Sequence, residues 1–384
     1  MTSLSPSPLG VDDVAGDAVA WRRHLHAHPE LSFQEHETAA FVRERLAEIG
    51  GYELSSPTPT SVVARLRFDR PGRTLALRAD MDALPIEEES GVEFASTRPG
   101  VMHACGHDAH TAQLLAVARL LAARREALAG EVRLLFQHAE ELPPGGAQEL
   151  VAAGALEGVD AVVGCHVISD LEVGRVSAVD GPCSAAADVF TARIRGKGGH
   201  AAFPEDSIDP IAAAAQAIAG LQQIVSREVA PRDRAVVSVT RVHGGTADNV
   251  IPEVVELGGT VRTYDEEVRR RIVASLRRIL DGVAAAHRCT AELDYVDGYR
   301  PTVNDAALAG LVRSLAGDRL AHYPPMMGGE DFSAYGAAAP ACFFFVGAGG
   351  PGAFPHHHPR FAIDEAALPV AIETFVSVAE RFLR

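Results

Sequence analysis

The chain has 384 residues, of which 47% are hydrophobic, and it carries 35 Lys and Arg against 51 Asp and Glu. This length and hydrophobic content suffice for two domains that each bury a core, so extended disorder is not expected. The formal net charge of −16 repels phosphate backbones and anionic lipid surfaces at long range. Nucleic acids and membranes are therefore not expected as partners.

The sequence shows no sign of export. Residues 1–20 contain no basic segment followed by an apolar one, and no later apolar run approaches the thickness of a bilayer. The five cysteines are scattered and form no CxxC pair, which argues against a disulfide framework. These features predict a cytoplasmic protein.

Strand-like and helix-like segments alternate in the first half of the chain. The expected elements are strands at residues 61–68, 74–80 and 131–137 and an amphipathic helix at residues 111–127. This alternation predicts an α/β domain in which helices flank a parallel or mixed sheet.

The pattern changes in the second half of the chain. The expected order is strand 188–195, helix 207–227, strands 235–243 and 254–263, helix 266–287 and strand 290–296. This β-α-β-β-α-β order is typical of a ferredoxin-like α+β unit. A strand at residues 341–346 and a final helix at residues 365–384 are expected to complete the first domain. We therefore predict a first domain formed by residues 1–181 and 299–384, interrupted by a smaller domain at residues 182–298.

Side chains that bind transition metals gather at four places. They are the run HACGHDAH at residues 103–110, the pairs Glu140-Glu141 and Cys165-His166, and the three histidines at residues 356–358. Each is expected at the end of a strand or in a loop, so the four places are expected to converge. Thiolate, imidazole and carboxylate together suit zinc and its neighbours, and they exceed the needs of one tetrahedral ion. The sequence therefore predicts two divalent metal ions.

The pair Glu140-Glu141 directly follows an expected strand. One carboxylate can bind a metal while the other takes a proton from water that the metals activate, which is chemistry suited to amide hydrolysis. An acidic pair is more often a solvated loop edge. The surrounding metal-binding residues favour the catalytic interpretation here.

Two other groups need a structural interpretation beside the functional one. A free cysteine is usually a small buried hydrophobe, but Cys105 has a histidine two positions away on either side. His24, His26 and His28 lie on an expected N-terminal helix, and we interpret them as packed or partly exposed histidines rather than ligands.

Seven segments carry a family resemblance. They are LALRADMDALPIEE (75–88), HACGHDAHTA (103–112), FQHAEE (136–141), GKGGHAAFP (196–204), NVIPE (249–253), GTVRTYD (259–265) and GGEDFS (328–333). In order and spacing they resemble the hippurate hydrolase and auxin-conjugate amidohydrolase branch of the aminoacylase and carboxypeptidase G superfamily of two-metal peptidases. The resemblance implies a zinc-exopeptidase-like catalytic α/β domain with a mixed sheet, interrupted by a lid domain that often mediates dimerisation. It also implies a binuclear centre that holds zinc, manganese or a related ion such as cobalt or nickel.

The resemblance implies a ligand set, residue by residue. Cys105 would be the bridging ligand, where more distant branches place an aspartate. His107 and His166 would complete one metal site, and Glu141 with His357 the other. Among the tail histidines, His357 keeps the His-x-Pro spacing of the family.

The resemblance also implies residues that act on the substrate. Glu140 is similar to the general acid/base of the family, and Asp80 to the aspartate that orients a metal-bound imidazole. His200 resembles a histidine that polarises the substrate carbonyl, which in dimers is commonly supplied by the neighbouring subunit. Asn249 and Arg262 resemble the groups that hold the free carboxylate of the substrate, for which a guanidinium is well suited.

Some positions depart from the family pattern or stay outside the ligand set. His138 stands where many relatives carry proline. We interpret His356 and His358 as loop histidines, and Glu330-Asp331 as residues that structure a loop.

The leading hypothesis is a homodimeric metal-dependent amidohydrolase that cleaves N-acyl amino acids to a carboxylate and a free amino acid. A dipeptidase or an N-acetyl-diaminopimelate deacetylase is the alternative within the superfamily. A hydrolase with Cys105 as nucleophile and His107 as base is a competing mechanism. A non-catalytic binding protein is disfavoured, because no assigned metal position holds an inert residue.

Overall fold

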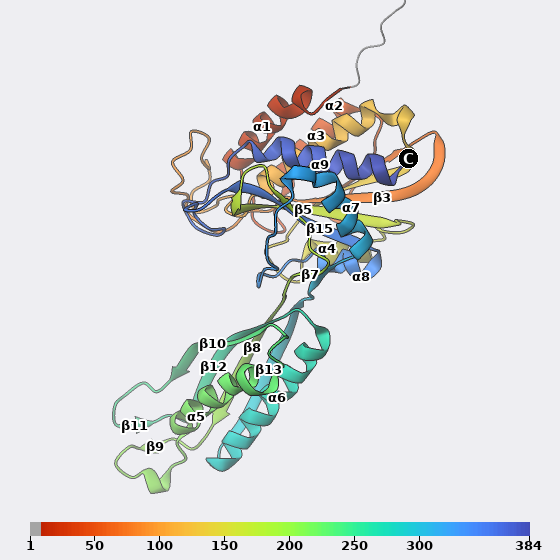
Figure 1. Ribbon diagram of the computed structural model, residues 1–384. Helices are drawn as coiled ribbons and strands as arrows, with labels where there is room; N and C mark the ends of the chain where they lie inside the picture. The colour runs from red at the N-terminus through yellow and green to blue at the C-terminus, as the bar shows by residue number, and fades with distance from the viewer. Residues whose placement is uncertain (1–8) are drawn as a thin grey trace, which may run out of the picture. The chain divides into compact units, whose positions relative to one another are not determined.

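The computed structural model describes residues 9–384 (Figure 1). The first eight residues, part of the segment inspected for an export signal, lie outside the described residues. The chain divides into two compact units. Unit 1 comprises the described residues up to Cys183 together with Val303–Pro324 and Asp331–Arg384, and unit 2 comprises Ser184–Thr302 and Pro325–Glu330. This division differs from the expected boundaries at three places. Residues 299–302 and 325–330, which the sequence placed in the first domain, belong to unit 2, and residues 182–183, which it placed in the second domain, belong to unit 1.

A seven-stranded mixed sheet forms the centre of unit 1. Its strands are β1 (Glu53–Ser55), β2 (Val62–Arg67), β3 (Arg70–Asp80), β4 (Ala129–Gln137), β5 (Ala161–Glu172), β6 (Val176–Ser177) and β15 (Ala341–Gly349). They are arranged in the order β1-β2-β4-β3-β5-β15-β6. Strands β4, β3, β5 and β15 are parallel to one another, whereas β1, β2 and β6 pair antiparallel with their neighbours. The predicted mixed α/β sheet is confirmed.

Helices cover both faces of this sheet (Figure 1). They are α1 (Asp12–Ala27), α2 (His36–Ile49), α3 (His107–Ala123), α4 (Gly146–Ala152), α7 (Ala306–Ala316), α8 (Ser333–Ala338) and α9 (Ala367–Phe382). Helices α1, α3 and α9 pack together on one face, and α4 and α8 pack together on the other. Helix α3 is rich in Ala and Leu and is buried on all sides over most of its length, as expected for a helix enclosed by other elements.

The central parallel strands are apolar because both of their faces are covered. Residues 341–348 of β15 and residues 161–169 of β5 are all buried. The carboxyl ends of adjacent parallel strands meet at one edge of a sheet, where α/β proteins place their sites. Here that edge carries Asp80 at the end of β3 and Gln137 at the end of β4.

Two local expectations were wrong. Helix α3 begins at His107 rather than at residue 111, and it ends at Ala123 rather than at residue 127. The residues of its first turn are polar, which is typical of an exposed turn. In the structure this turn follows Gly106, which has a φ of 93°, and its polar side chains are buried against ionic partners. The pair Cys165-His166 lies inside β5 rather than after a strand, because the strand continues through its polar residues.

A buried ionic network joins β3, β4 and the segment that begins at Asp331. Arg78 donates to Asp80 Oδ2 at 2.6 Å and to Asp331 Oδ1 at 2.9 Å, and all three side chains are fully buried. The same guanidinium donates to Gln137 Oε1 at 2.8 Å, while Gln137 Nε2 and the amide of Ala147 both donate to Asp331 Oδ2. Asp331 therefore structures the loops around it, in agreement with its interpretation from sequence.

Unit 2 contains β8 (Ala186–Arg195), β9 (Gly199–His200), α5 (Pro210–Gln223), β10 (Ala235–Gly244), β11 (Val250–Ile251), β12 (Val254–Thr263), α6 (Glu266–Ala286) and β13 (Thr290–Tyr299). Its main sheet is antiparallel with the order β10-β12-β8-β13, which is the ferredoxin-like arrangement that the sequence indicated. Helix α5 begins at Pro210 and not at residue 207, because Asp209 caps it by accepting from the amides of residues 211 and 212.

Two further strands, β7 (Gly181–Ser184) and β14 (Thr302–Asn304), pair with each other. Among the described residues, no helix combines the length and the apolar character that crossing a bilayer would require.

The buried network yields a stability prediction. Replacing Asp331 with Ala leaves the buried charge of Arg78 partly unpaired, and we expect the free energy of unfolding to fall by about 3–5 kcal/mol. Urea denaturation followed by circular dichroism measures this change. As a control, Glu373→Ala removes an exposed pair with Arg319 and should cost about 0–1 kcal/mol. Equal effects of the two substitutions would contradict the role assigned to the network.

Candidate metal centre

The structure places all five predicted ligands in unit 1. Cys105 precedes α3, His107 is the first residue of α3, Glu141 follows β4, His166 lies in β5 and His357 lies in the loop before α9. Segments far apart in the sequence thus meet at one place.

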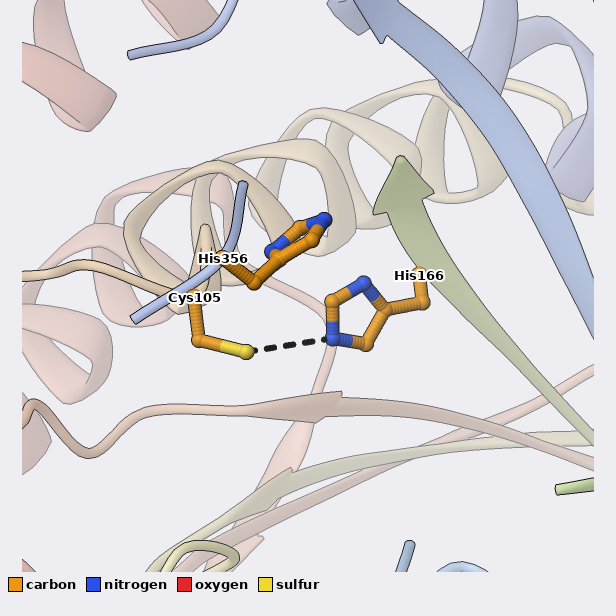
Figure 2. A group of neighbouring side chains, drawn as sticks. All are labelled: Cys105, His166 and His356. Atoms are coloured by element: carbon orange, nitrogen blue, oxygen red, sulfur yellow. Dashed lines mark hydrogen bonds between the residues drawn. The ribbon is translucent and has the colours of Figure 1, made fainter. Parts of the chain in front are cut away.

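Cys105 lies at the centre of this cluster. Its Sγ is 3.4 Å from His166 Nε2, and with His356 they form one group whose ligand atoms all lie within 4.8 Å of one another (Figure 2). A second group of the same tightness contains Cys105, Glu141 and His357. The Cys105 thiol is common to both groups, as a ligand that bridges two ions would be.

His107 is oriented by a carboxylate and faces others. Its Nδ1 lies 2.9 Å from the carbonyl oxygen of Asp82 and 3.2 Å from Asp82 Oδ1. When Nδ1 donates to Asp82, Nε2 is left with the lone pair that a metal requires. Nε2 lies 3.6 Å from Asp80, 4.0 Å from Glu140 and 3.9 Å from Glu141.

The donor atoms fit divalent cations. His107 Nε2 and Glu141 Oε1 are buried, and neither has a hydrogen-bond partner among residues 9–384. His166 Nδ1 contacts the carbonyl oxygen of Val167 at 2.6 Å, which leaves its Nε2 lone pair directed at Cys105. Thiolate, imidazole and carboxylate are together the ligands of zinc and neighbouring transition metals.

The distribution of ligands between two ions is less simple than the sequence suggested. Glu141 Oε1 lies 3.2 Å from His357 Nε2 and 3.9 Å from His107 Nε2, so this carboxylate adjoins both histidines. The ring centroids of His107 and His166, which were expected to share an ion, are 6.2 Å apart. The pairing of histidines with ions stays a prediction.

Two of the three tail histidines approach Cys105. His356 Nε2 accepts from the amide of Ser169 at 3.3 Å, while its Nδ1 is buried without a hydrogen-bond partner among the described residues. His357 is 52% exposed and adopts a left-handed φ of 64°. His358 belongs to neither group and accepts from a nearby backbone amide. The choice of His357 as ligand stays a prediction, and the geometry keeps His356 beside it.

Asp80 contacts His110, which is outside the predicted ligand set, and its expected role of orienting a metal-bound imidazole stays a prediction. Its Oδ1 lies 2.6 Å from His110 Nδ1, and its Oδ2 accepts from Arg78. Burial would raise the pKa of Asp80, but the charge of Arg78 and the nearby imidazoles hold that pKa well below its ordinary value. Since His110 Nε2 accepts from the amide of Val167, both ring nitrogens of His110 are occupied and it is not a free ligand.

Asp82 is the residue that our sequence reasoning missed. It contacts His107 Nδ1, and its Oδ2 accepts from Ser32 Oγ at 2.7 Å and from the amide of Glu141 at 3.0 Å. The signal was the second aspartate of RADMD, two positions beyond Asp80 at the end of the same strand. A carboxylate that orients a ligand imidazole is a regular feature of metal sites.

The surroundings of Cys105 argue against a cysteine nucleophile. Burial, and then the charges of Glu141 and Glu140, raise the pKa of the Cys105 thiol well above its ordinary value, whereas nucleophilic cysteines need a lowered pKa. The Nδ1 of His107, the base of this alternative, is occupied by Asp82.

His26 is a structural residue, as the sequence indicated for the N-terminal histidines. Its ring nitrogens lie 2.9 Å from Asp108 and 3.0 Å from Glu88. Burial lowers the pKa of His26, but the charge of Asp108 and the hydrogen bonds to both carboxylates outweigh burial and raise that pKa to about 9. The imidazolium thus joins α1 to α3 and to the segment after β3.

His200 and Asn249 lie together in unit 2. Strand β9 pairs with β11 so that Val250 is opposite His200, and the amide of Ala201 donates to the carbonyl oxygen of Asn249 at 3.0 Å. The His200 side chain is exposed, and its Nδ1 accepts from the amide of Ala202.

Arg262 lies at the other end of the same unit. It is opposite Ala187 in the pairing of β12 with β8, whereas Val254 at the far end of β12 is opposite Arg195, and His200 lies beyond Arg195. At ~3.3 Å per residue these two ends are about 25 Å apart. Within one chain, the structure does not bring His200 and Arg262 together.

A family model described as Peptidase family M20/M25/M40 matches residues 76–381. The chain belongs to this family.

Relatives within the M20 family carry amidohydrolase names. The chain is 56% identical over 294 residues to an N-acyl-L-amino acid amidohydrolase of Geobacillus stearothermophilus, with 77% of this chain and 80% of the relative covered. It is 45% identical to the N-acetylcysteine deacetylase of Bacillus subtilis, covering 93% and 94%, and 42% identical to the IAA-amino acid hydrolase ILR1-like 4 of Arabidopsis thaliana, covering 95% and 85%. The predicted family branch and the predicted enzyme class, a metallo-amidohydrolase, are confirmed.

Solved structures support the same family assignment. A protein from methicillin-resistant Staphylococcus aureus superimposes with a TM-score of 0.92 at 36% identity, covering 97% of this chain and 98% of that one. A Bacillus subtilis protein described as a dinuclear metal binding peptidase from the M20 family superimposes with a TM-score of 0.87 at 40% identity, covering 97% and 99%. The M20 fold and a centre for two divalent metals follow.

Asp82 provides a test of the metal centre. Asp82→Ala removes the carboxylate that orients His107, and we expect metal affinity to fall by roughly 10–100-fold. Calorimetric titration of metal-free protein with Zn²⁺ measures the change. The exposed Asp69 serves as the control, since Asp69→Ala should leave affinity unchanged. An Asp82→Ala variant with wild-type affinity would show that His107 needs no such support.

Proposed function

We propose that this M20 enzyme removes the acyl group from N-acyl L-amino acids, with Glu140 as the general base. The observation that carries the proposal is the Cys105 thiol, common to two ligand groups, beside the adjacent pair Glu140-Glu141. The pair supplies one carboxylate for a metal and one for a proton, which is the division that two-metal amide hydrolysis requires.

The protein residues have distinct tasks. Bound divalent ions act as Lewis acids that polarise the scissile carbonyl and acidify water. Glu140 is buried, with an oxygen 4.0 Å from His107 Nε2, so it is placed to accept the proton of the attacking water. It then passes this proton to the leaving amine. Cys105, His107, Glu141, His166 and His357 hold the ions, which we expect to be zinc or manganese, with cobalt or nickel as substitutes.

The substrate class is supported by the names of the relatives and by a cation in unit 2. Arg262 is half-buried, and one of its nitrogens donates to the carbonyl oxygens of Asp188 and Val261 and to Thr260. A fixed guanidinium is suited to the free carboxylate of an amino acid. We assign carboxylate binding to Arg262 and Asn249. Because Asn249 lies beside His200, it would reach the substrate from the same copy of unit 2 as His200. Small N-acyl amino acids are the expected partners, and a cytoplasmic location is the expected setting.

His200 acts in a neighbouring subunit. Arg262 lies at one end of β12, and β9 with His200 follows the other end of β8, about 25 Å away along the sheet. A small substrate held by one residue therefore cannot reach the other within that chain. A homodimer offers a second copy of each group, so the His200 that polarises the substrate carbonyl comes from the partner.

The base is tested by Glu140→Gln. We expect kcat to fall by at least about 100-fold with two metals per chain retained, because the amide cannot accept the proton. The assay uses N-acetyl, hippuryl and indoleacetyl amino acids and a dipeptide, with metal content measured by mass spectrometry. Glu157→Gln, at an exposed position, is the control. A variant that keeps its rate would refute Glu140 as base, and cleavage of the dipeptide alone would favour the dipeptidase alternative.

The dimer is tested by complementation. Glu140→Gln and His200→Ala are each expected to be inactive as homodimers. Co-expressed in equal amounts, they should recover about one quarter of wild-type activity, because half of the dimers are mixed and each mixed dimer has one intact site. Absence of recovery, with mixed dimers present in native mass spectrometry, would place His200 in its own subunit's site.

A further inference from the structure

The residue before the proposed base has an unusual backbone. Ala139 has a φ of 48°, in the left-handed region that residues with a Cβ adopt rarely. It lies between the end of β4 at Gln137 and the pair Glu140-Glu141. This conformation turns the chain so that the acidic pair leaves the line of the strand, and it needs support from neighbouring groups.

The support comes from a carboxylate more than a hundred residues away in sequence. Glu35 Oε1 accepts from the amide of Ala139 at 2.8 Å and from the amide of Phe33 at 3.0 Å. At the following peptide group, the carbonyl oxygen of Ala139 accepts from the amide of Gly146 at 3.0 Å. The Glu35 side chain is fully buried, so its position is fixed by packing.

The same turn of the chain also supports the residue after the base. Ser32 Oγ donates to Asp82 Oδ2, and Asp82 Oδ2 accepts from the amide of Glu141. The amides on either side of Glu140 are thus both held by carboxylates, one by Glu35 directly and one by Asp82, which Ser32 contacts.

We propose that Glu35 is a positioning residue that holds Ala139 in its left-handed conformation and so places Glu140 and Glu141. This role rests on the proposed function of Glu140. Glu35 is not a member of the ligand groups found among the described residues, and the proposed effect runs through the backbone of Ala139.

The geometry indicates that the length of the Glu35 side chain, rather than its charge, is what holds the amide of Ala139. One oxygen receives both amides, and a neutral carbonyl oxygen also has the two lone pairs needed to accept both. Burial, followed by the charge of Asp82, raises the pKa of Glu35 to about 7, so a neutral form of this side chain is close in free energy at physiological pH. A glutamine has the same reach without the charge, whereas an aspartate has the charge but is one methylene shorter.

These two variants form the test. We expect Glu35→Gln to keep kcat within about threefold of wild type, and Glu35→Asp to lose roughly 30–100-fold in kcat, as displacement of a catalytic group by about 1 Å does. KM should stay within about threefold in both, since substrate recognition is assigned to unit 2. Glu37→Asp, at a 71% exposed position, is the matched control and should leave kcat unchanged.

Hydrogen exchange gives a second readout that needs no activity. In metal-free protein, the amide of Ala139 should exchange as slowly in Glu35→Gln as in wild type, and at least about tenfold faster in Glu35→Asp. This order of exchange rates would support the positioning role even if the wild-type protein cleaved no N-acyl amino acid. Such a lack of cleavage would refute only the proposed function.

Three results would overturn the proposal. One is unchanged kcat and unchanged exchange in Glu35→Asp. Another is a loss of tenfold or more in Glu35→Gln, which would make charge the relevant property. The Glu35→Gln result decides the question even if the Glu35→Asp variant does not fold. The third is an equal loss in the Glu37→Asp control.

Discussion

Arg78 carries a positive charge inside unit 1, and much of the metal centre depends on how that charge is neutralised. Its guanidinium is fully buried and bonds Asp80, Asp331 and Gln137. A buried charge is tolerated only when it is paired and hydrogen-bonded. Since Asp80 also contacts His110 of α3, this one side chain fixes the ends of β3 and β4 relative to the first turn of α3. The candidate ligands Cys105, His107 and Glu141 lie close to those points in the sequence.

The carboxylates that remain create a site for cations. Asp80, Asp82, Glu140 and Glu141 each have an oxygen within 4.0 Å of a ring nitrogen of His107. Burial lowers the pKa of His107, but this surrounding charge outweighs burial and raises that pKa to about 10. The field that holds a proton on the ring also attracts a divalent ion to Nε2, and binding of that ion would release the proton.

The sequence predicted what was local and missed what was formed by distant contacts. Glu140-Glu141 and the HACGHDAH run are contiguous, so their chemistry was visible without a fold. The role of Asp82 was not visible, because its contact with His107 spans 25 positions and exists only once β3 and α3 are packed. The start of α3 was misplaced for the same reason: polar residues at a helix start are typical of exposed turns, and only the ionic partners of Asp108 show why they are buried.

In unit 2, the two residues assigned to the substrate lie far apart, which the sequence of either segment alone could not reveal. The sequence assigned both His200 and Arg262 to the substrate, and each sits on a well-defined strand. The register of β12 with β8 nevertheless places Arg262 at one end of the main sheet, and the strand that contains His200 follows β8 at the other end. If Arg262 binds the substrate carboxylate and His200 polarises the carbonyl, as we propose, the two groups must come from different copies of this unit. The proposed homodimer would reconcile the two assignments, because its symmetry would supply at each site the group that the site's own chain holds too far away.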